Sequence, residues 1–167
     1  MSESDEIDEI VAAWRRERPD LDEESLSAMG TVGRLALVYA LGTRAIDGVF
    51  TQHGLRGGEF DVLAALRRAG EPYTLTPSLL ADRLMLTRAG MTSRLDRLEA
   101  AGLVERHLDA EDRRSFLVRL TPRGLEVVDA AVADHAANEA RLLQGLAPAD
   151  RAALDRVLRV LLRSARG

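Results

Sequence analysis

The 167-residue chain contains no cysteine and no lysine, and all 23 of its basic residues are arginine. Without thiols it can form neither a disulfide framework nor a thiolate metal site. Its three histidines, His53, His107 and His135, are too widely separated to form a metal-ligand motif. No uninterrupted run of about 18 apolar residues is present, so no membrane span is predicted. The acidic start, MSESDEIDEI, is unlike a signal peptide, and a cytoplasmic protein is expected.

Enzymatic signatures are also missing. The sequence has no Ser-His-Asp pattern and no glycine-rich phosphate motif, so we do not expect an enzyme. A net charge of −4 would argue against a nucleic-acid binder, but the charge is unevenly distributed. Residues 83–123 hold nine arginines against six acids, whereas the rest of the chain holds 14 arginines against 21 acids. The positive charge is therefore concentrated where it could meet phosphates.

Apolar residues recur at helical spacing through most of the chain and predict a mainly helical protein. The first helix has an apolar stripe at Ile7, Ile10, Val11 and Trp14, and it ends before Pro19. Further helices are predicted over residues 24–53, 57–69, from 76 onward, 87–101, 122–143 and 148–164. The last of them carries a second stripe, from Leu154 to Leu161.

Residues 87–124 are the most informative segment. Thr87 is a good helix N-cap, Met91 and Leu95 lie on one apolar face, and Gly102 suits the helix end. Two short strands, 103–108 and 115–120, follow and are joined by the polar loop DAEDRR. A short helix beside a basic hairpin is typical of DNA-reading domains. The predicted DNA contacts are Thr87, Arg88, Thr92, Ser93, Arg94, Arg97, Arg113 and Arg114.

The patterns LxRLExxGLVER and DxxDRRSFLVRLTPRG resemble the winged helix-turn-helix of MarR-type transcriptional regulators. This resemblance implies a mainly α fold with a small β-hairpin wing. It implies one MarR-type domain over 1–167, with the DNA-binding region at 54–121. Residues 1–53, including an extra N-terminal helix at 1–18, and 122–167 would form the dimerisation region. A homodimer on a double-stranded, pseudo-palindromic operator is expected.

A finer resemblance joins WRRERPDLD and GEFDVLAALRRAG to the PecS/HucR branch, the urate-responsive regulators. That branch is marked by four ligand-site residues, which here are Trp14, Asp61, Arg94 and Arg106. Chemically, an indole can stack on a flat purine anion, and an arginine fork suits its oxygen-rich edge. The resemblance therefore implies a repressor released by urate or a related purine, with no cofactor and no metal.

Each assignment has a simpler alternative. Trp14 can be a core aromatic, Asp61 can favour a helix dipole, Arg94 can contact a phosphate, and Arg106 can pair with Glu105 or Asp109. The wing loop can be only a tight turn. Two alternatives for the whole chain stay open as well: a MarR-type regulator of a phenolic compound or antibiotic, and a winged-helix module for protein contacts.

Overall fold

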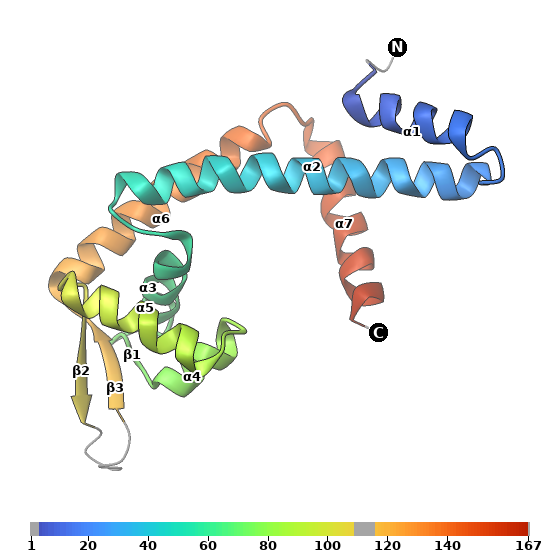
Figure 1. Ribbon diagram of the computed structural model, residues 1–167. Helices are drawn as coiled ribbons and strands as arrows, with labels where there is room; N and C mark the ends of the chain where they lie inside the picture. The colour runs from blue at the N-terminus through green and yellow to red at the C-terminus, as the bar shows by residue number, and fades with distance from the viewer. Residues whose placement is uncertain (1–3, 109–115, 167) are drawn as a thin grey trace. The chain divides into compact units, whose positions relative to one another are not determined.

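A computed structural model describes residues 4–108 and 116–166 and confirms the predicted fold class (Figure 1). The helices and the two strands of the hairpin lie within a few residues of their predicted bounds. The elements are α1 (Glu6–Glu17), α2 (Glu23–Gln52), α3 (Gly57–Arg68), β1 (Thr74–Leu75), α4 (Pro77–Arg83), α5 (Arg88–Ala100), β2 (Val104–Leu108), β3 (Phe116–Leu120), α6 (Pro122–Leu142) and α7 (Pro148–Ala165). The chain forms two compact units, which divide within α2 after Ala45.

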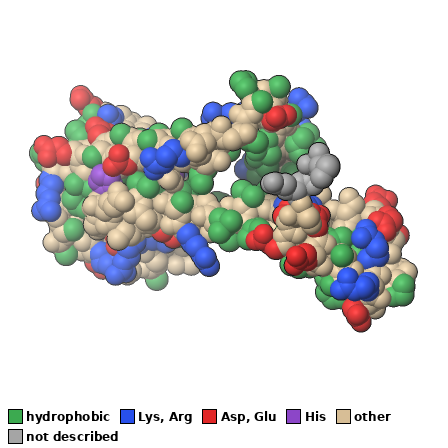
Figure 2. All heavy atoms as spheres, turned by 90° about the horizontal axis from the view of Figure 1, so that it is seen from above, with side chains coloured by type: hydrophobic (Ala, Val, Ile, Leu, Met, Phe, Trp, Pro, Cys, Tyr) green, Lys and Arg blue, Asp and Glu red, His purple; other side chains and the backbone are tan. Residues whose placement is uncertain are grey.

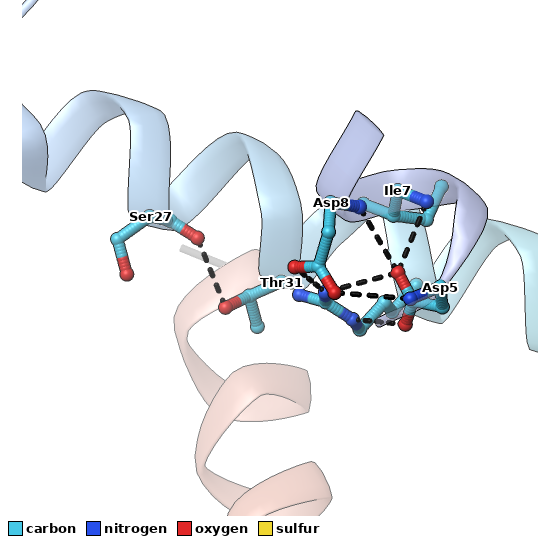
Figure 3. Close-up of polar contacts among 6 residues, drawn as sticks. Asp5, Ile7, Asp8, Ser27 and Thr31 are labelled. Atoms are coloured by element: carbon cyan, nitrogen blue, oxygen red, sulfur yellow. Dashed lines mark hydrogen bonds and ion pairs between the residues drawn. The ribbon is translucent and has the colours of Figure 1, made fainter. Parts of the chain in front are cut away.

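The N-terminal unit contains α1 and most of α2. Asp5 caps α1 by accepting hydrogen bonds of 3.0 Å from the backbone amides of Ile7 and Asp8 (Figure 3). Arg34 of α2 donates to Asp5 at 2.7 Å and also pairs with Asp8. Ile7 is buried and lies against Gly33, where a methyl group would come within 3.3 Å of its side chain. The extra N-terminal helix is thus joined to α2 by a cap, an ion pair and a close apolar contact.

The second unit, from residue 46 onward, holds the hydrophobic core. α3 is buried at almost every position from Glu59 to Leu66, and the inward positions predicted for it, Phe60, Leu63, Ala64 and Leu66, are all covered. The core face predicted for α5 is also confirmed, because Met91, Leu95 and Leu98 are buried. α3 packs against both α5 and α6, and α5 packs against α4. α3 therefore connects the helix-turn-helix pair, α4 and α5, to α6.

The sheet has three antiparallel strands in the order β1-β3-β2. β2 and β3 form the predicted wing hairpin, in which Val104 pairs with Leu120 and Leu108 with Phe116. β1 was not predicted. It has two residues, too few to show an alternating pattern, and it pairs Thr74 with Arg119. Only the pairing with β3 makes it a strand.

α2 is long and apolar enough, by length and composition alone, to cross a membrane. The expectation of no membrane span was based on the absence of an uninterrupted apolar run. α2 instead reaches a high mean hydropathy with polar residues interspersed among the apolar ones. One such helix is weak evidence for a membrane span, because core helices of soluble proteins can have the same length and composition. Little of the apolar stretch is buried within the chain, and Val32, Val38 and Tyr39 are largely exposed. The helix therefore presents apolar surface that a partner could cover.

Candidate nucleic-acid interface and effector site

α5 has the features of a DNA-recognition helix and is called the reading helix below. The Thr87 side chain caps it by accepting a hydrogen bond of 3.1 Å from the amide of Gly90. Because Met91 and Leu95 fix one face in the core, the opposite face is left exposed. That face carries Thr92 and Ser93, and Arg88 at the helix start is exposed too. These placements suit the predicted DNA contacts, whose role stays a prediction. Arg113 and Arg114, predicted at the wing tip, lie outside the described residues.

Arg94 points from α5 to the first turn of α3. A methyl group on Gly58 would lie 2.5 Å from its Nε and 2.7 Å from its Cζ, so the guanidinium rests directly on the α3 backbone. Only glycine at position 58 leaves room for this contact. Among the described residues Arg94 makes no direct hydrogen bond or ion pair, and it is half-buried. It is thus a cation held in place chiefly by packing.

Asp61 lies one helical turn beyond Gly58, on the same side of α3. Asp61 is exposed at the surface, yet partial loss of surrounding water raises the pKa of its carboxyl, and the neighbouring Arg94, Arg68 and His135 oppose the rise. The structure therefore places Asp61 and Arg94 near each other, and their role in ligand binding stays a prediction. The pair joins α3 to the reading helix by charge, without a direct hydrogen bond in the described part of the chain.

The raised pKa of Asp61 predicts a pH effect on stability. Because the folded protein holds this proton more tightly than the unfolded chain does, ionisation of Asp61 costs stability as the pH rises through its folded pKa. Asp61→Asn removes that cost. We expect the free energy of unfolding of the variant, relative to wild type, to increase from about pH 4 to about pH 7. Urea unfolding at a fixed protein concentration measures it; a constant difference across this range would contradict the prediction.

A second acid of α3, which is not among the predicted site residues, is also bound to α5. Glu59 is 7% exposed. Its carboxylate accepts a hydrogen bond of 2.7 Å from Nε of Arg97 and one of 3.0 Å from the backbone amide of Arg56. Burial raises the pKa of Glu59, but these two hydrogen bonds, together with the positive charges of Arg97 and Arg56, outweigh it and leave the pKa below its ordinary value. Arg97, a predicted DNA contact, is thus engaged within the protein. The available signal was a glutamate at the third position of a helix, which commonly reaches back to the N-cap amide.

Arg106 lies elsewhere. From β2 its Nη2 contacts Asp96 at 2.7 Å and its Nη1 contacts Glu99 at 3.4 Å. These two acids lie roughly 140–200° around α5 from Arg94. The structure therefore places Arg106 on the opposite side of the reading helix from the Asp61–Arg94 pair. Of the partners suggested for it, Glu105 binds Arg119 and His107 instead, and Asp109 lies outside the described residues.

Arg106 also lines a cavity of about 290 Å³, together with Pro77, Thr92, Leu95 and Phe116. The cavity combines one cation, one aromatic ring and aliphatic walls. Such a lining suits a small aromatic anion.

Trp14 lies on α1, in the N-terminal unit, whereas the other three ligand-site residues belong to the second unit. Its side chain is 42% exposed, so it is not a core residue of this chain, and an indole face is available for stacking. Its part in a shared site stays a prediction. Across residues 4–108 and 116–166 no cluster of three or more His, Asp or Glu residues could hold a metal ion.

Comparisons with known proteins agree with this architecture. The model of the MarR family matches residues 53–115. The chain is 44% identical to the HTH-type transcriptional regulator PecS of Dickeya dadantii over 138 residues, which cover 83% of this chain and 81% of PecS.

Two solved structures have the same fold. AbsC, a MarR family transcriptional regulator from Streptomyces coelicolor, superposes with a TM-score of 0.73 at 28% identity, covering 88% of this chain and 97% of AbsC. Bordetella bronchiseptica BpsR, described by the regulation of its DNA binding by 6-hydroxynicotinic acid, superposes with a TM-score of 0.66 at 27% identity, covering 77% and 90%. The relatives are regulators and not enzymes. The chain belongs to the MarR family of DNA-binding transcriptional regulators and is a homologue of PecS.

Proposed function

We propose that this regulator is a cytoplasmic homodimeric repressor that binds a pseudo-palindromic operator and is released by a small anionic purine, urate or a close relative. The observation that carries the proposal is the Asp61–Arg94 pair, because the packing of Arg94 against Gly58 holds a cation of the reading helix beside the Asp61 carboxyl of α3. An anion drawn to Arg94 and Arg68 competes with Asp61 for that charge. The alternative of a module for protein contacts has no support among relatives that are DNA-binding regulators.

DNA binding is assigned to residues 54–121. The exposed face of α5 presents Arg88, Thr92 and Ser93, which can reach base edges or phosphates in the major groove. The wing arginines, Arg113 and Arg114, are proposed to contact the adjacent backbone or minor groove. BpsR, whose DNA binding is regulated by a ligand, shares this architecture.

Dimerisation is assigned to residues 1–53 and 122–167. Hydrophobic side chains lie among charged ones on the surface in view in Figure 2. On α7 five large apolar residues are exposed: Leu154, Val157, Val160, Leu161 and Leu162. Such a face normally needs a covering partner. A two-fold dimer would set two α5 helices about one turn of DNA apart, roughly 34 Å.

Effector binding would then act by shifting the protein between a DNA-bound state and a released state, which differ in the contact between Asp61 and Arg94. A ligand shifts an equilibrium only by binding the two states with different affinities. In the DNA-bound state Asp61 holds Arg94 near α3; in the released state the anion takes the place of Asp61 beside Arg94, and α5 shifts. From the resemblance, Trp14 would stack on the purine and Arg106 would complete the site. Because Arg106 lies on the opposite side of α5 from Arg94, it would have to leave Asp96 and Glu99 and change its position relative to α5 to do so.

The test is release of an operator duplex, obtained by in vitro selection with the wild-type protein, on titration with urate. We expect Asp61→Asn to bind the duplex but to need roughly tenfold or more urate for release, since a charge-assisted contact is worth about 1.5–3 kcal/mol. Gly58→Ala should also change the response, because the added methyl group displaces the Arg94 guanidinium.

Asp129→Asn is the matched control, because Asp129 binds Arg67 of the same helix α3 at 2.7 Å and has no contact with Arg94. Its response should equal that of wild type. Equal urate responses of wild type and Asp61→Asn would rule out Asp61 as the switch.

The cavity beside Arg106 supports a second candidate, a regulator of a phenolic or other aromatic carboxylate. BpsR, for which the ligand is 6-hydroxynicotinic acid, is a relative consistent with this class. Titration with salicylate separates the two. Release by salicylate but not urate, lost in Phe116→Ala and kept in Asp61→Asn, would favour this candidate.

A further inference from the structure

We infer that Glu59 is a positioning residue for DNA reading: it takes up the charge of Arg97 and so limits the attraction of the reading helix for any DNA backbone. The inference rests on the DNA-binding part of the proposed function and not on the effector. Glu59 sits on α3, outside the predicted DNA contacts, yet its only side-chain partner among the described residues lies on α5.

The carboxylate of Glu59 is held from two directions. One oxygen accepts from the backbone amide of Arg56 at 3.0 Å, which fixes it to the start of α3. The other accepts from Nε of Arg97 at 2.7 Å. Since the side chain is buried, it cannot follow Arg97 outward. Glu59 therefore acts as a fixed anchor, and Arg97 must break the ion pair to reach a phosphate.

Arg97 is restrained at its far end too. Its Nη1 donates to the hydroxyl of Ser93, one turn earlier on α5, at 2.8 Å. The side chain thus lies back along its own helix toward α3. It remains partly exposed, so its charge is close to the DNA-facing surface without being available as an unpaired cation. Arg88, in contrast, is exposed at the helix start and has no ion pair within the described part of the chain.

The energetic consequence concerns specificity. Every phosphate neutralised by an arginine adds to sequence-independent affinity and makes binding more salt-dependent, by about 0.9 in logarithmic slope. An Arg97 released from Glu59 would add such a contact above all on random DNA, where no base contacts fix the position of α5. Holding it on Glu59 lowers affinity for random DNA more than for an operator, where α5 is also held by base contacts.

The experiment compares wild type, Glu59→Gln, Arg97→Gln and the double variant on a random-sequence duplex and on a duplex selected with wild-type protein, over a range of salt. Glutamine keeps the shape and an oxygen that accepts from Arg56, but it lacks the charge. For Glu59→Gln we expect several-fold tighter binding of the random duplex and a salt slope steeper by about 0.9 per bound subunit. The preference for the selected duplex should fall.

The double variant identifies the group responsible. If Arg97 carries the effect, Glu59→Gln should change neither slope nor affinity once Arg97→Gln is present. Asp129→Asn again serves as control, because it removes one negative charge from the same unit away from α5. Its slope should change much less.

A purely structural role for Glu59 predicts a different outcome. Both duplexes would then bind more weakly in parallel with a lower melting temperature, and the slope would be unchanged; that result would overturn the inference. An unchanged slope with normal stability would overturn it as well. Wild-type protein that does not prefer the selected duplex would instead count against the proposed regulatory function, whatever Glu59→Gln does to the salt slope.

Discussion

Leu161→Asp is expected to turn the protein into a monomer and to abolish operator binding. Leu161 is 47% exposed on α7 and belongs to the apolar face that also includes Leu154 and Val157. In the proposed dimer this face is covered, so the aspartate would be an unpaired charge in an apolar interface. A penalty of about 4 kcal/mol corresponds to roughly a thousandfold rise in the dimer dissociation constant. When the two DNA-binding regions are no longer linked in one dimer, they lose most of the affinity gained by binding the operator together.

Sedimentation equilibrium on wild type and variant measures the effect. Arg163→Gln is the matched control: it changes the net charge by the same amount, but it lies about 200° from Leu161 around α7. It should stay dimeric. Because Leu161 is exposed within its own chain, its replacement should not disturb the core. A Leu161→Asp variant that remains a dimer would remove α7 from the interface, and a monomeric wild type would remove the dimer model altogether.

Gly124→Ala should be the most destabilising single methyl group in the described structure. Gly124 lies in the first turn of α6 and is buried against the backbone of Leu103. An added methyl carbon would overlap the Leu103 carbonyl oxygen and lie 2.9 Å from its carbonyl carbon. That oxygen already accepts a hydrogen bond of 3.1 Å from the amide of Thr121, so it cannot simply turn away. α6 would have to separate from the end of α5 and β2.

We expect a loss of about 3–5 kcal/mol in the free energy of unfolding, which is in the range of severe overpacking. Thermal or urea unfolding measures it. Gly145→Ala is the control, since nothing lies within 4 Å of its added methyl group, and it should change stability by no more than about 0.5 kcal/mol. A near-wild-type Gly124→Ala would mean that α6 can move away from Leu103 without cost.

Local patterns were enough to predict most of the fold. Thr87, Thr121 and Pro122 mark helix starts through caps and a fixed backbone angle, which depend only on neighbouring residues. The periodicity of Met91, Leu95 and Leu98 identified the buried face of α5, because burial on a helix follows its 3.6-residue repeat. β1 was missed, since a two-residue strand is created by its neighbour β3 and not by its own sequence.

The candidate site shows the same difference between features that local sequence predicts and features that depend on tertiary packing. The sequence by itself determined that arginines concentrate on the reading helix and wing. The positions of Asp61 and Arg94 within the family pattern identified them as candidate site residues. Only the tertiary structure decided which acid each arginine meets: Arg97 binds Glu59, and Arg106 binds Asp96 and Glu99. The physical reason is reach. An arginine side chain can extend to any of several carboxylates, so its partner is set by how α3, α5 and β2 pack and not by its position in the chain.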